Sequence, residues 1–274
     1  HVADRFDLRS NIQFETTVAS AKFDESTSRW TVTTDKGEVF SAQWCIMATG
    51  CLSSTNLPDF DGLDDFSGDW YHTGLWPKEG VDFTGKRVAV VGTGSSAIQS
   101  IPVIAQQAKS LTVFQRTANF SIPAHNGPLS PKFVEQIKSD YSNFRQLNND
   151  TFSGFGGRWT RYQDSVMDAT PEERQRRFDE KWKLGGFHFL NSFADIGASD
   201  EHNQFAADYA RDKIRAIVND PETAELLCPD QVIGCKRLCV DTGYFDTFNL
   251  DHVKLVSVKD HPIERITANG LVTN

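Results

Sequence analysis

The sequence predicts an α/β fold in which a parallel βαβ unit is interrupted by helices and preceded by a separate group of strands. Three observations support this prediction. Residues 11–50 are rich in β-branched and aromatic side chains arranged in short segments. Arg87–Val91 is a continuous apolar run followed by a glycine-rich turn, as expected of a buried parallel strand. Between them, residues 51–86 are rich in Pro, Gly and Asp, which is typical of a connecting loop.

The N-terminal strands are expected at four places, and polar turn-forming stretches separate them. They are Ile12–Glu15, Val18–Phe23, Trp30–Thr33 and Trp44–Met47. The last strand runs into Ala48-Thr49-Gly50. Before them, Val2, Phe6 and Leu8 have the spacing of the end of an amphipathic helix.

The βαβ unit is expected from Arg87 onward. Gly92–Ala97 forms the turn, and the apolar residues from Ile98 to Ala108 have helical spacing. Leu111–Phe114 is the next strand. Pro102 falls inside the expected helix, so we expect that helix to be less regular than its neighbours.

Residues 131–230 are expected to form a helical insertion. Its candidate helices are Phe133–Leu147, Glu172–Leu184, Glu201–Val218 and Glu222–Leu227. Thr170 and Asp220 each precede a proline, which predicts an N-cap followed by proline in the first helical turn.

Strands return after Val232, at Val253–Val258 and Ile263–Thr267. Asn269-Gly270 then predicts a hairpin. The chain starts at His1 without a methionine and stops just after this turn, so we expect an internal piece of a longer protein.

Composition restricts the classes of partner. The 274 residues are 39% hydrophobic with a formal net charge of -9, and no long basic run is present, so nucleic acid is not expected as a partner. No apolar segment approaches the roughly 20 residues that span a bilayer, and no signal peptide is visible. The five cysteines are odd in number and match no common zinc spacing. Free thiols, no metal and a reducing cytoplasmic location are therefore expected.

The glycine-rich turn indicates a Rossmann-like dinucleotide site. Gly92 permits a tight turn, Gly94 lets main-chain N–H groups approach a pyrophosphate, and the small Ala97 allows the helix to pack on the strand. The helix N-terminus then presents unpaired N–H donors to the phosphates. The candidate cofactor-binding residues here are Gly92, Thr93, Gly94, Ser95, Ser96, Ala97 and Gln99.

The end of the second strand indicates which dinucleotide binds. Sites for NADH usually place a carboxylate there to hold the ribose diol. Here the strand ends in Gln115-Arg116-Thr117 and offers no carboxylate. Arg116 can form paired hydrogen bonds with a 2′-phosphate and Thr117 can donate to it, which favours NADPH.

A further pattern precedes the turn: F-x-G-x-x-x-H-x-x-x-W-P, formed by Phe66, Gly68, His72, Trp76 and Pro77. After the turn come Arg116-Thr117, the basic pair Lys236-Arg237 and the phrase Tyr244–Asn249. In this order, the set resembles the Baeyer–Villiger monooxygenases across nearly the whole chain. These flavoproteins use NADPH and O2 to insert oxygen next to a ketone carbonyl.

The resemblance implies a domain organisation and two cofactors, FAD and NADPH. Residues 1–50 would be the end of an FAD-binding domain and 51–86 a linker carrying the fingerprint. Residues 87–130 and 231–274 would form the NADP-binding domain, and 131–230 its helical insertion. Much of the FAD domain would lie outside this chain, so the piece alone is expected to be inactive.

The resemblance also implies roles for single residues. Lys236 would help to recognise NADPH, and Arg237 would be the active-site residue. Negative charge develops on oxygen during insertion, and a guanidinium stabilises it without losing its own proton. The fingerprint, His72 and Trp76 included, would act as a hinge or gate between domains. Without the resemblance, Lys236-Arg237 would more often be a surface basic pair.

Two other functions stay open from the sequence. A flavin-containing or N-hydroxylating monooxygenase shares the first part of the fingerprint, but Trp76-Pro77 and Lys236-Arg237 favour the Baeyer–Villiger reaction. An enzyme of this kind could also catalyse sulfoxidation. A non-catalytic NADP-binding module is the alternative outside the enzymes. The expected partners of the leading function are a small ketone and O2.

Overall fold

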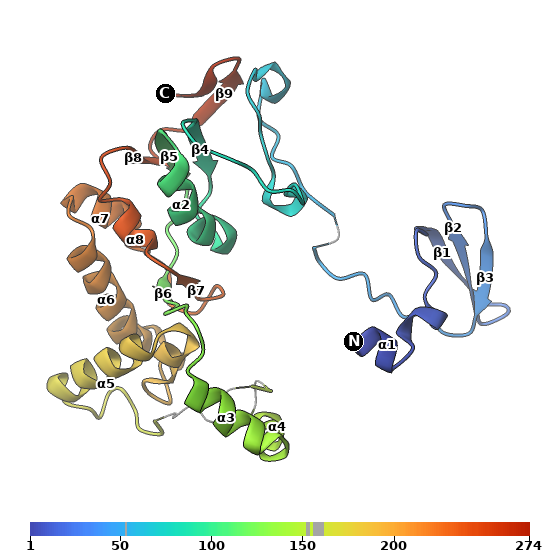
Figure 1. Cartoon of the computed structure of the whole chain (residues 1–274), viewed down its shortest axis with the longest axis horizontal. Helices are drawn as coiled ribbons and strands as arrows, with labels where there is room; N and C mark the ends of the chain where they lie inside the picture. The colour runs from blue at the N-terminus through green and yellow to red at the C-terminus, as the bar shows by residue number, and fades with distance from the viewer. Residues whose placement is uncertain (53, 152–153, 156–161) are drawn as a thin grey trace. The chain divides into compact units, whose positions relative to one another are not determined.

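The computed structural model describes residues 1–52, 54–151, 154–155 and 162–274 (Figure 1). The chain divides into two compact units, His1–Asn56 and Leu57–Asn274. In the described residues, the first unit contains one sheet and the second contains three.

The first unit is built on an antiparallel sheet of three strands in the order β1-β2-β3. The elements are α1 (Val2–Arg5), η1 (Leu8–Asn11), β1 (Val18–Asp24), β2 (Arg29–Thr34) and β3 (Val39–Ala42). The rings of Phe23 and Trp30, which are paired across β1 and β2, lie 5.4 Å apart. Such cross-strand aromatic pairs fix the register of an antiparallel sheet.

Two of the four strands expected here are wrong. Ile12–Glu15 and Trp44–Met47 lie outside any strand. A strand needs a hydrogen-bonded neighbour as well as suitable side chains, and neither segment has one in the described residues. The Trp44 and Ile46 side chains are accordingly 80% and 91% exposed. Strand β3, whose Val39 pairs with Thr33 of β2, was not predicted from the sequence.

The second unit contains the expected parallel sheet, in the order β4-β5-β8 (Figure 1). Its main elements are β4 (Arg87–Val91), α2 (Ser95–Gln107), β5 (Ser110–Gln115) and β8 (Val253–Ser257). Leu111 and Val113 of β5 are fully buried with Ile98 and Ile101 of α2. Burying one such side chain contributes about 1.5–3 kcal/mol, so this contact fixes the helix on the sheet. The βαβ prediction is confirmed, and α2 continues through Pro102 to Gln107.

A second pair of parallel strands joins distant parts of the chain. β6 (Ser121–Pro123) pairs with β7 (Cys239–Asp241) in a short ladder. The ladder is anchored by a buried hydrogen bond from Ser121 Oγ to Asp241 Oδ2 of 2.5 Å. β7 therefore carries the segment before it, Lys236–Leu238, to a fixed place beside β6.

The helical insertion is present, with one difference from the prediction. Its helices are α3 (Pro131–Ser139), α4 (Tyr141–Asn149), α5 (Pro171–Leu184), η4 (Gly186–Asn191), α6 (Asp200–Ile217) and α7 (Pro221–Leu227). The single helix expected at Phe133–Leu147 is broken at Asp140, whose φ and ψ are -148° and 63° and whose carboxylate accepts from Asn143 N. Thr170 and Asp220 cap α5 and α7 as predicted.

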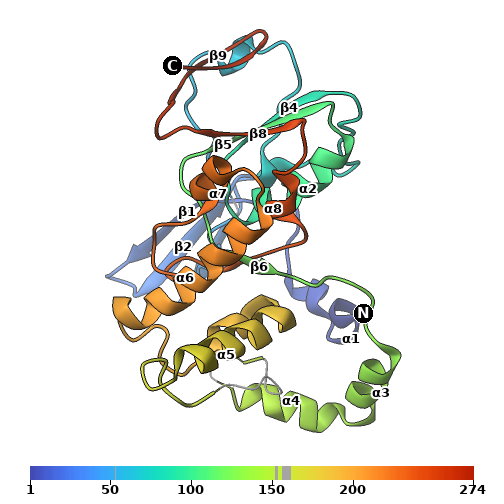
Figure 2. The same ribbon diagram turned by 90° about the vertical axis from the view of Figure 1, so that its left-hand side faces the viewer.

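The insertion connects to the sheet through α6. Figures 1 and 2 show α6 running from α5 to α7 and α8 (Tyr244–Thr247) beside the parallel sheet. Phe178, Phe189 and Tyr209 pack together, with ring centroids 5.2–5.7 Å apart. Because Phe120 and Ile122 are buried in the same cluster, the insertion is packed on the segment that follows β5.

β9 (Ile263–Thr267) and β10 (Gly270–Thr273) form an antiparallel hairpin at the C-terminus, which confirms the Asn-Gly prediction. The connector that precedes β4 packs on this hairpin. Ile266 N donates to Asp61 O at 2.7 Å, and Ser67 N donates to Ala268 O at 3.2 Å. Two short 3-10 turns, η2 (Leu63–Asp65) and η3 (Thr73–Leu75), complete it. In the described part of the chain, no helix has both the length and the apolar character that crossing a membrane requires.

Candidate functional site

The glycine turn leaves β4 in a conformation that its sequence makes possible. Gly92 has a φ of +100°, where side chains are strained and glycine is not. Its N–H donates to Phe114 O at 2.8 Å, which fastens the turn to β5. Gly94 has an ordinary φ of -77°, and a Cβ built there would meet nothing within 4 Å. A side chain at Gly94 would thus be tolerated by the protein and would obstruct only a ligand lying on the turn.

The first turn of α2 has no side-chain cap: Gly94 stands at the N-cap and offers no acceptor. Side chains cap the other helices of seven or more residues, in the order Ser130, Asp140, Thr170, Ser199 and Asp220. The first N–H groups of α2 are therefore available to an external acceptor, and the helix dipole favours an anion there.

Thr93, between the two glycines, is held from both sides. It is only 4% exposed, and its Oγ1 donates to Thr117 O at 2.9 Å. Asn119 Nδ2 donates to Thr93 O at 2.7 Å. The segment that follows β5 therefore fixes the turn. Sequence reasoning missed Asn119, because an asparagine after a strand carries no local signal of this contact.

Arg116 and Thr117 follow β5 at the same edge of the sheet as the turn, since β4 and β5 are parallel with Val91 paired to Phe114. Arg116 is exposed and makes no ion pair with any described residue. Its guanidinium is thus available to a ligand at this edge. Ser95, Ser96 and Gln99 lie on the first turns of α2, and Gln99 Nε2 donates to Ser95 O and to Ser95 Oγ.

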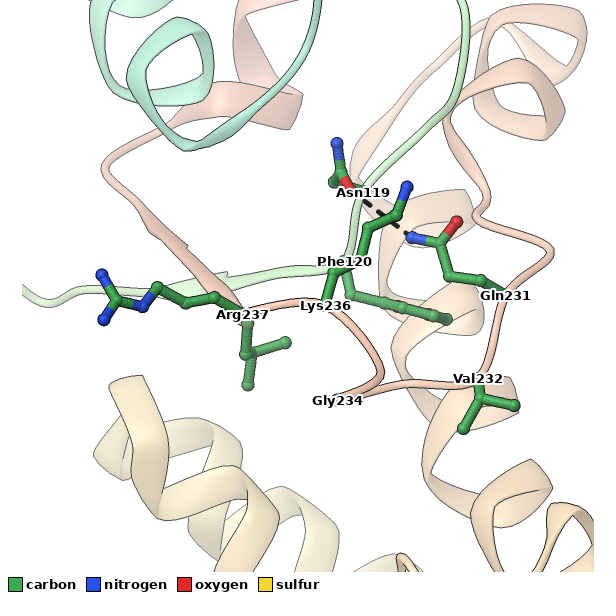
Figure 3. Close-up of a pocket in the computed structure, with 8 residues that line it drawn as sticks. Asn119, Phe120, Gln231, Val232, Gly234, Lys236 and Arg237 are labelled. Atoms are coloured by element: carbon green, nitrogen blue, oxygen red, sulfur yellow. Dashed lines mark hydrogen bonds between the residues drawn. The ribbon is translucent and has the colours of Figure 1, made fainter. Parts of the chain in front are cut away.

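Lys236 and Arg237 lie on the loop before β7 and line a pocket (Figure 3). The lining residues are Asn119, Phe120, Gln231, Val232, Gly234, Lys236, Arg237 and Leu238. Both basic side chains are exposed and form no ion pair in the described part of the chain. Figure 3 shows the Lys236 side chain extending to the side of Asn119 and Gln231, whereas Arg237 extends the other way. The pair thus presents two separate cations.

Gln231 and Cys239, on either side of the Lys236-Arg237 pair, join this loop to the segment after β5 and to the start of α2. Gln231 Nε2 donates to Ala118 O at 3.1 Å and to Asn119 Oδ1 at 3.5 Å. Cys239 N donates to Phe120 O at 3.2 Å, and its thiol hydrogen-bonds Ser95 at the start of α2. Burial raises the pKa of the Cys239 thiol, which keeps it neutral. The structure therefore brings Lys236-Arg237 and the turn to one region although the sequence separates them widely.

The fingerprint residues form a local structure of their own. His72 Nδ1 accepts from Gly74 N at 3.0 Å and so caps η3. The Trp76 ring lies 5.8 Å from Tyr71 and 6.1 Å from Phe83. At Gly68 a Cβ would come within 2.7 Å of the Phe66 ring, which explains the glycine. None of the fingerprint residues, Pro77 included, lines the pocket at Lys236-Arg237.

All five cysteines are free. In the described ranges, no group of three or more His, Cys, Asp or Glu side chains is placed to hold a metal ion. The site is therefore defined by main-chain donors and by cations.

Comparison with known proteins agrees with this geometry. The Flavin-binding monooxygenase-like family matches residues 1–125. A Baeyer-Villiger monooxygenase of Pseudooceanicola batsensis is 41% identical over 272 residues, which cover 98% of this chain and 49% of that protein. A steroid monooxygenase structure bound to NADP is 49% identical with a TM-score of 0.92, over 100% of this chain and 52% of that chain. Over nearly its whole length, the chain is therefore similar to Baeyer–Villiger monooxygenases.

Two further relatives add detail. The structure of OTEMO in complex with FAD and NADP is 37% identical with a TM-score of 0.93, over 99% of this chain and 51% of that chain. The phenazine N-monooxygenase PhzNO1 of Lysobacter antibioticus is 41% identical over 279 residues, 99% of this chain and 50% of that protein. The proteins similar to this chain thus include an enzyme named for oxidation at nitrogen. The chain spans about half the length of the curated relatives that it matches.

Proposed function

We propose that the chain belongs to an FAD- and NADPH-dependent monooxygenase that inserts one oxygen atom of O2 next to a ketone carbonyl and so forms an ester or lactone. The observation that carries this proposal is the convergence of an uncapped, glycine-rich helix start with the Lys236-Arg237 loop. Relatives that bind NADP, or FAD and NADP, share the fold over this whole chain.

The residues of the glycine turn fit the pyrophosphate of NADPH. The free N–H groups at the start of α2 would donate to phosphate oxygens, and the open space at Gly94 would admit them. Arg116 would form charge-assisted hydrogen bonds with the 2′-phosphate, with Thr117 beside it. Lys236 would supply a second cation, because it too forms no ion pair in the described residues. These residues together favour NADPH over NADH.

Arg237 would carry the chemistry of this chain. Bound FAD, once reduced by NADPH, would supply the group that reacts with O2. A guanidinium beside the ketone would stabilise negative charge as it develops on oxygen, and it would keep its proton at working pH. The loop geometry supports this role, since Arg237 lines the pocket and extends away from Lys236 (Figure 3).

A domain assignment is part of the same proposal. Residues 1–50 would close the FAD-binding domain, 51–86 would form the linker, 87–130 with 231–274 would form the NADP-binding domain, and 131–230 would be its insertion. The fingerprint would then act as a hinge, because it is fixed by its own aromatic cluster and does not line the pocket. A reducing cytoplasm, supported by five free cysteines, is part of the proposal.

Oxidation at nitrogen is the second candidate, and the similarity to a phenazine N-monooxygenase favours it. A product assay separates the two. The enzyme that contains this chain is given NADPH and O2 with either a cyclic ketone or an aromatic amine of similar size. We expect ester or lactone from the ketone; N-oxide as the sole product would favour the second candidate.

A flavin absorbance spectrum tests the alternative of a non-catalytic NADP-binding module. We expect that enzyme to show the yellow colour of bound FAD. A colourless protein that binds NADPH and oxidises neither substrate would favour the module.

A further inference from the structure

Resting on the proposed function, we infer that Asn119 is a positioning residue: with Gln231 it forms an amide relay that couples the shape of the glycine turn to the Lys236-Arg237 loop. Its first contact is the hydrogen bond from Asn119 Nδ2 to Thr93 O, at 2.7 Å. A carbonyl held from this side fixes the peptide plane between Thr93 and Gly94. That plane sets the direction of the next N–H group, which faces the phosphates in a turn of this kind.

Thr93 is well suited to such control. It is buried, and its hydroxyl already donates to Thr117 O at 2.9 Å. The side chain and the carbonyl of one turn residue are thus both bonded to the segment after β5, which also carries Arg116. The pyrophosphate donors and the 2′-phosphate cation therefore move as one unit.

Gln231 extends this unit to the basic loop. Its Nε2 donates to Ala118 O at 3.1 Å and lies 3.5 Å from Asn119 Oδ1. Gln231 lies five positions before Lys236, and both line the same pocket with Asn119 (Figure 3). The relay runs from Thr93 through Asn119 to Gln231, and so it links the turn to the loop that carries Lys236 and Arg237.

The relay has a chemical weakness that can be tested. Asn119→Asp keeps the size of the side chain and replaces the donor to Thr93 O by an oxygen, so two acceptors would face each other. The turn would shift to separate them. We expect the dissociation constants for NADPH and NADH to rise by a similar factor of about 10, since the shift affects the shared pyrophosphate donors. Arg116→Ala should instead affect NADPH far more than NADH.

Asn249→Asp is the matched control. Asn249 Nδ2 donates to Ile217 O and its Oδ1 accepts from Asn219 N, both at 2.8 Å. It therefore makes the same kind of contact in the same unit, and neither of these partners lines the pocket. We expect Asn249→Asp to lower the melting temperature about as much as Asn119→Asp and to leave the dissociation constants unchanged.

The experiment measures NADPH and NADH binding and thermal unfolding in the enzyme that contains this chain, with Gln231→Glu as a second variant. In the relay, Gln231→Glu weakens binding in the same direction, and the double variant Asn119→Asp/Gln231→Glu is less than additive. NADPH binding by Asn119→Asp equal to that of the wild type would overturn the inference. So would strictly additive effects, and if Asn119→Asp does not fold, unchanged binding by Gln231→Glu decides against it. A wild-type enzyme that binds no NADPH would contradict the proposed function itself.

Discussion

The glycine turn and the Lys236-Arg237 loop, two parts of the proposed site, are held in place by different means. Hydrogen bonds that the turn donates to the Phe114 and Thr117 carbonyls, and one that Asn119 donates to the turn, fix it before any ligand binds. The two basic side chains of the loop are exposed and form no contact of that kind in the described residues. The turn is therefore pre-organised, whereas the loop presents exposed charge near it.

This difference separates two kinds of energetic contribution. Donors fixed in advance lose little conformational entropy when a ligand binds. Long basic side chains lose about 0.5–1.5 kcal/mol each on being ordered, and they act mainly through charge. Changes in the turn should therefore alter binding of any dinucleotide, and changes in the loop should alter selectivity and chemistry.

The largest effect is expected for Arg237→Ala. Loss of one comparable oxyanion donor costs about 10²–10³ in rate, so ester formation should fall by at least that factor while NADPH oxidation continues. Product chromatography with parallel absorbance at 340 nm measures the two rates. Arg265→Ala, an exposed arginine on β9, is the control. Full ester yield in Arg237→Ala would remove its catalytic role.

The next largest effect concerns Gly94→Ala. The protein has room for the added methyl group, so the melting temperature should stay within about 1 °C of the wild type. Binding of NADPH should weaken by at least about 10-fold, because the methyl group occupies the approach of the phosphates. Titration calorimetry measures the affinity.

Gly92→Ala provides the contrast for that measurement. Its φ of +100° strains any side chain, so this variant should lose stability as well as binding. If Gly94→Ala bound NADPH normally, the phosphates would not lie on this turn.

Arg116→Ala tests selectivity. A hydrogen bond to a charged group contributes about 1.5–3 kcal/mol, so the KM for NADPH should rise about 10- to 100-fold with little change for NADH. Arg87→Ala is a matched control, because Arg87 is also exposed and stands at the opposite end of β4. An unchanged ratio of the two KM values would refute the 2′-phosphate assignment.

The smallest effect concerns His188 in the insertion, outside both regions. Burial, and then the nearby Lys181, lower the pKa of His188 below its ordinary value of 6.5. The unfolded state thus binds the proton more readily, so stability is complete above pH 6.5 and falls as the pH drops below it. His188→Asn should flatten the decrease in melting temperature between pH 7.5 and 5.5 and leave NADPH affinity unchanged. An equally steep decrease in the variant would show that His188 is not responsible.

Features with local causes could be predicted from the sequence. The glycine turn, the caps at Thr170 and Asp220 and the Asn269-Gly270 hairpin each depend on a few adjacent residues, and the structure contains all of them. The break at Asp140 was missed because its neighbours keep helical spacing on both sides. Trp44–Met47 was wrongly assigned because β composition does not supply a partner strand.

The contacts that assemble the site could not be predicted, because they join residues far apart in the chain. Asn119 and Thr93 are 26 positions apart, and Gln231 and Ala118 are 113 apart. Single amides carry no periodic signal, and the three-residue strands β6 and β7 are too short to recognise. From the sequence, only the family resemblance indicated a functional role for Lys236-Arg237. The structure adds the hydrogen bonds that link their loop to the region of the turn.

The most direct test of the account is a reaction of the enzyme that contains this chain with a cyclic ketone, NADPH and ¹⁸O-labelled O2. Mass spectrometry then identifies the product. We predict a lactone that carries one labelled oxygen atom, formed in proportion to the NADPH oxidised. Complete recovery of the ketone, in an enzyme that holds FAD and oxidises NADPH, would contradict it.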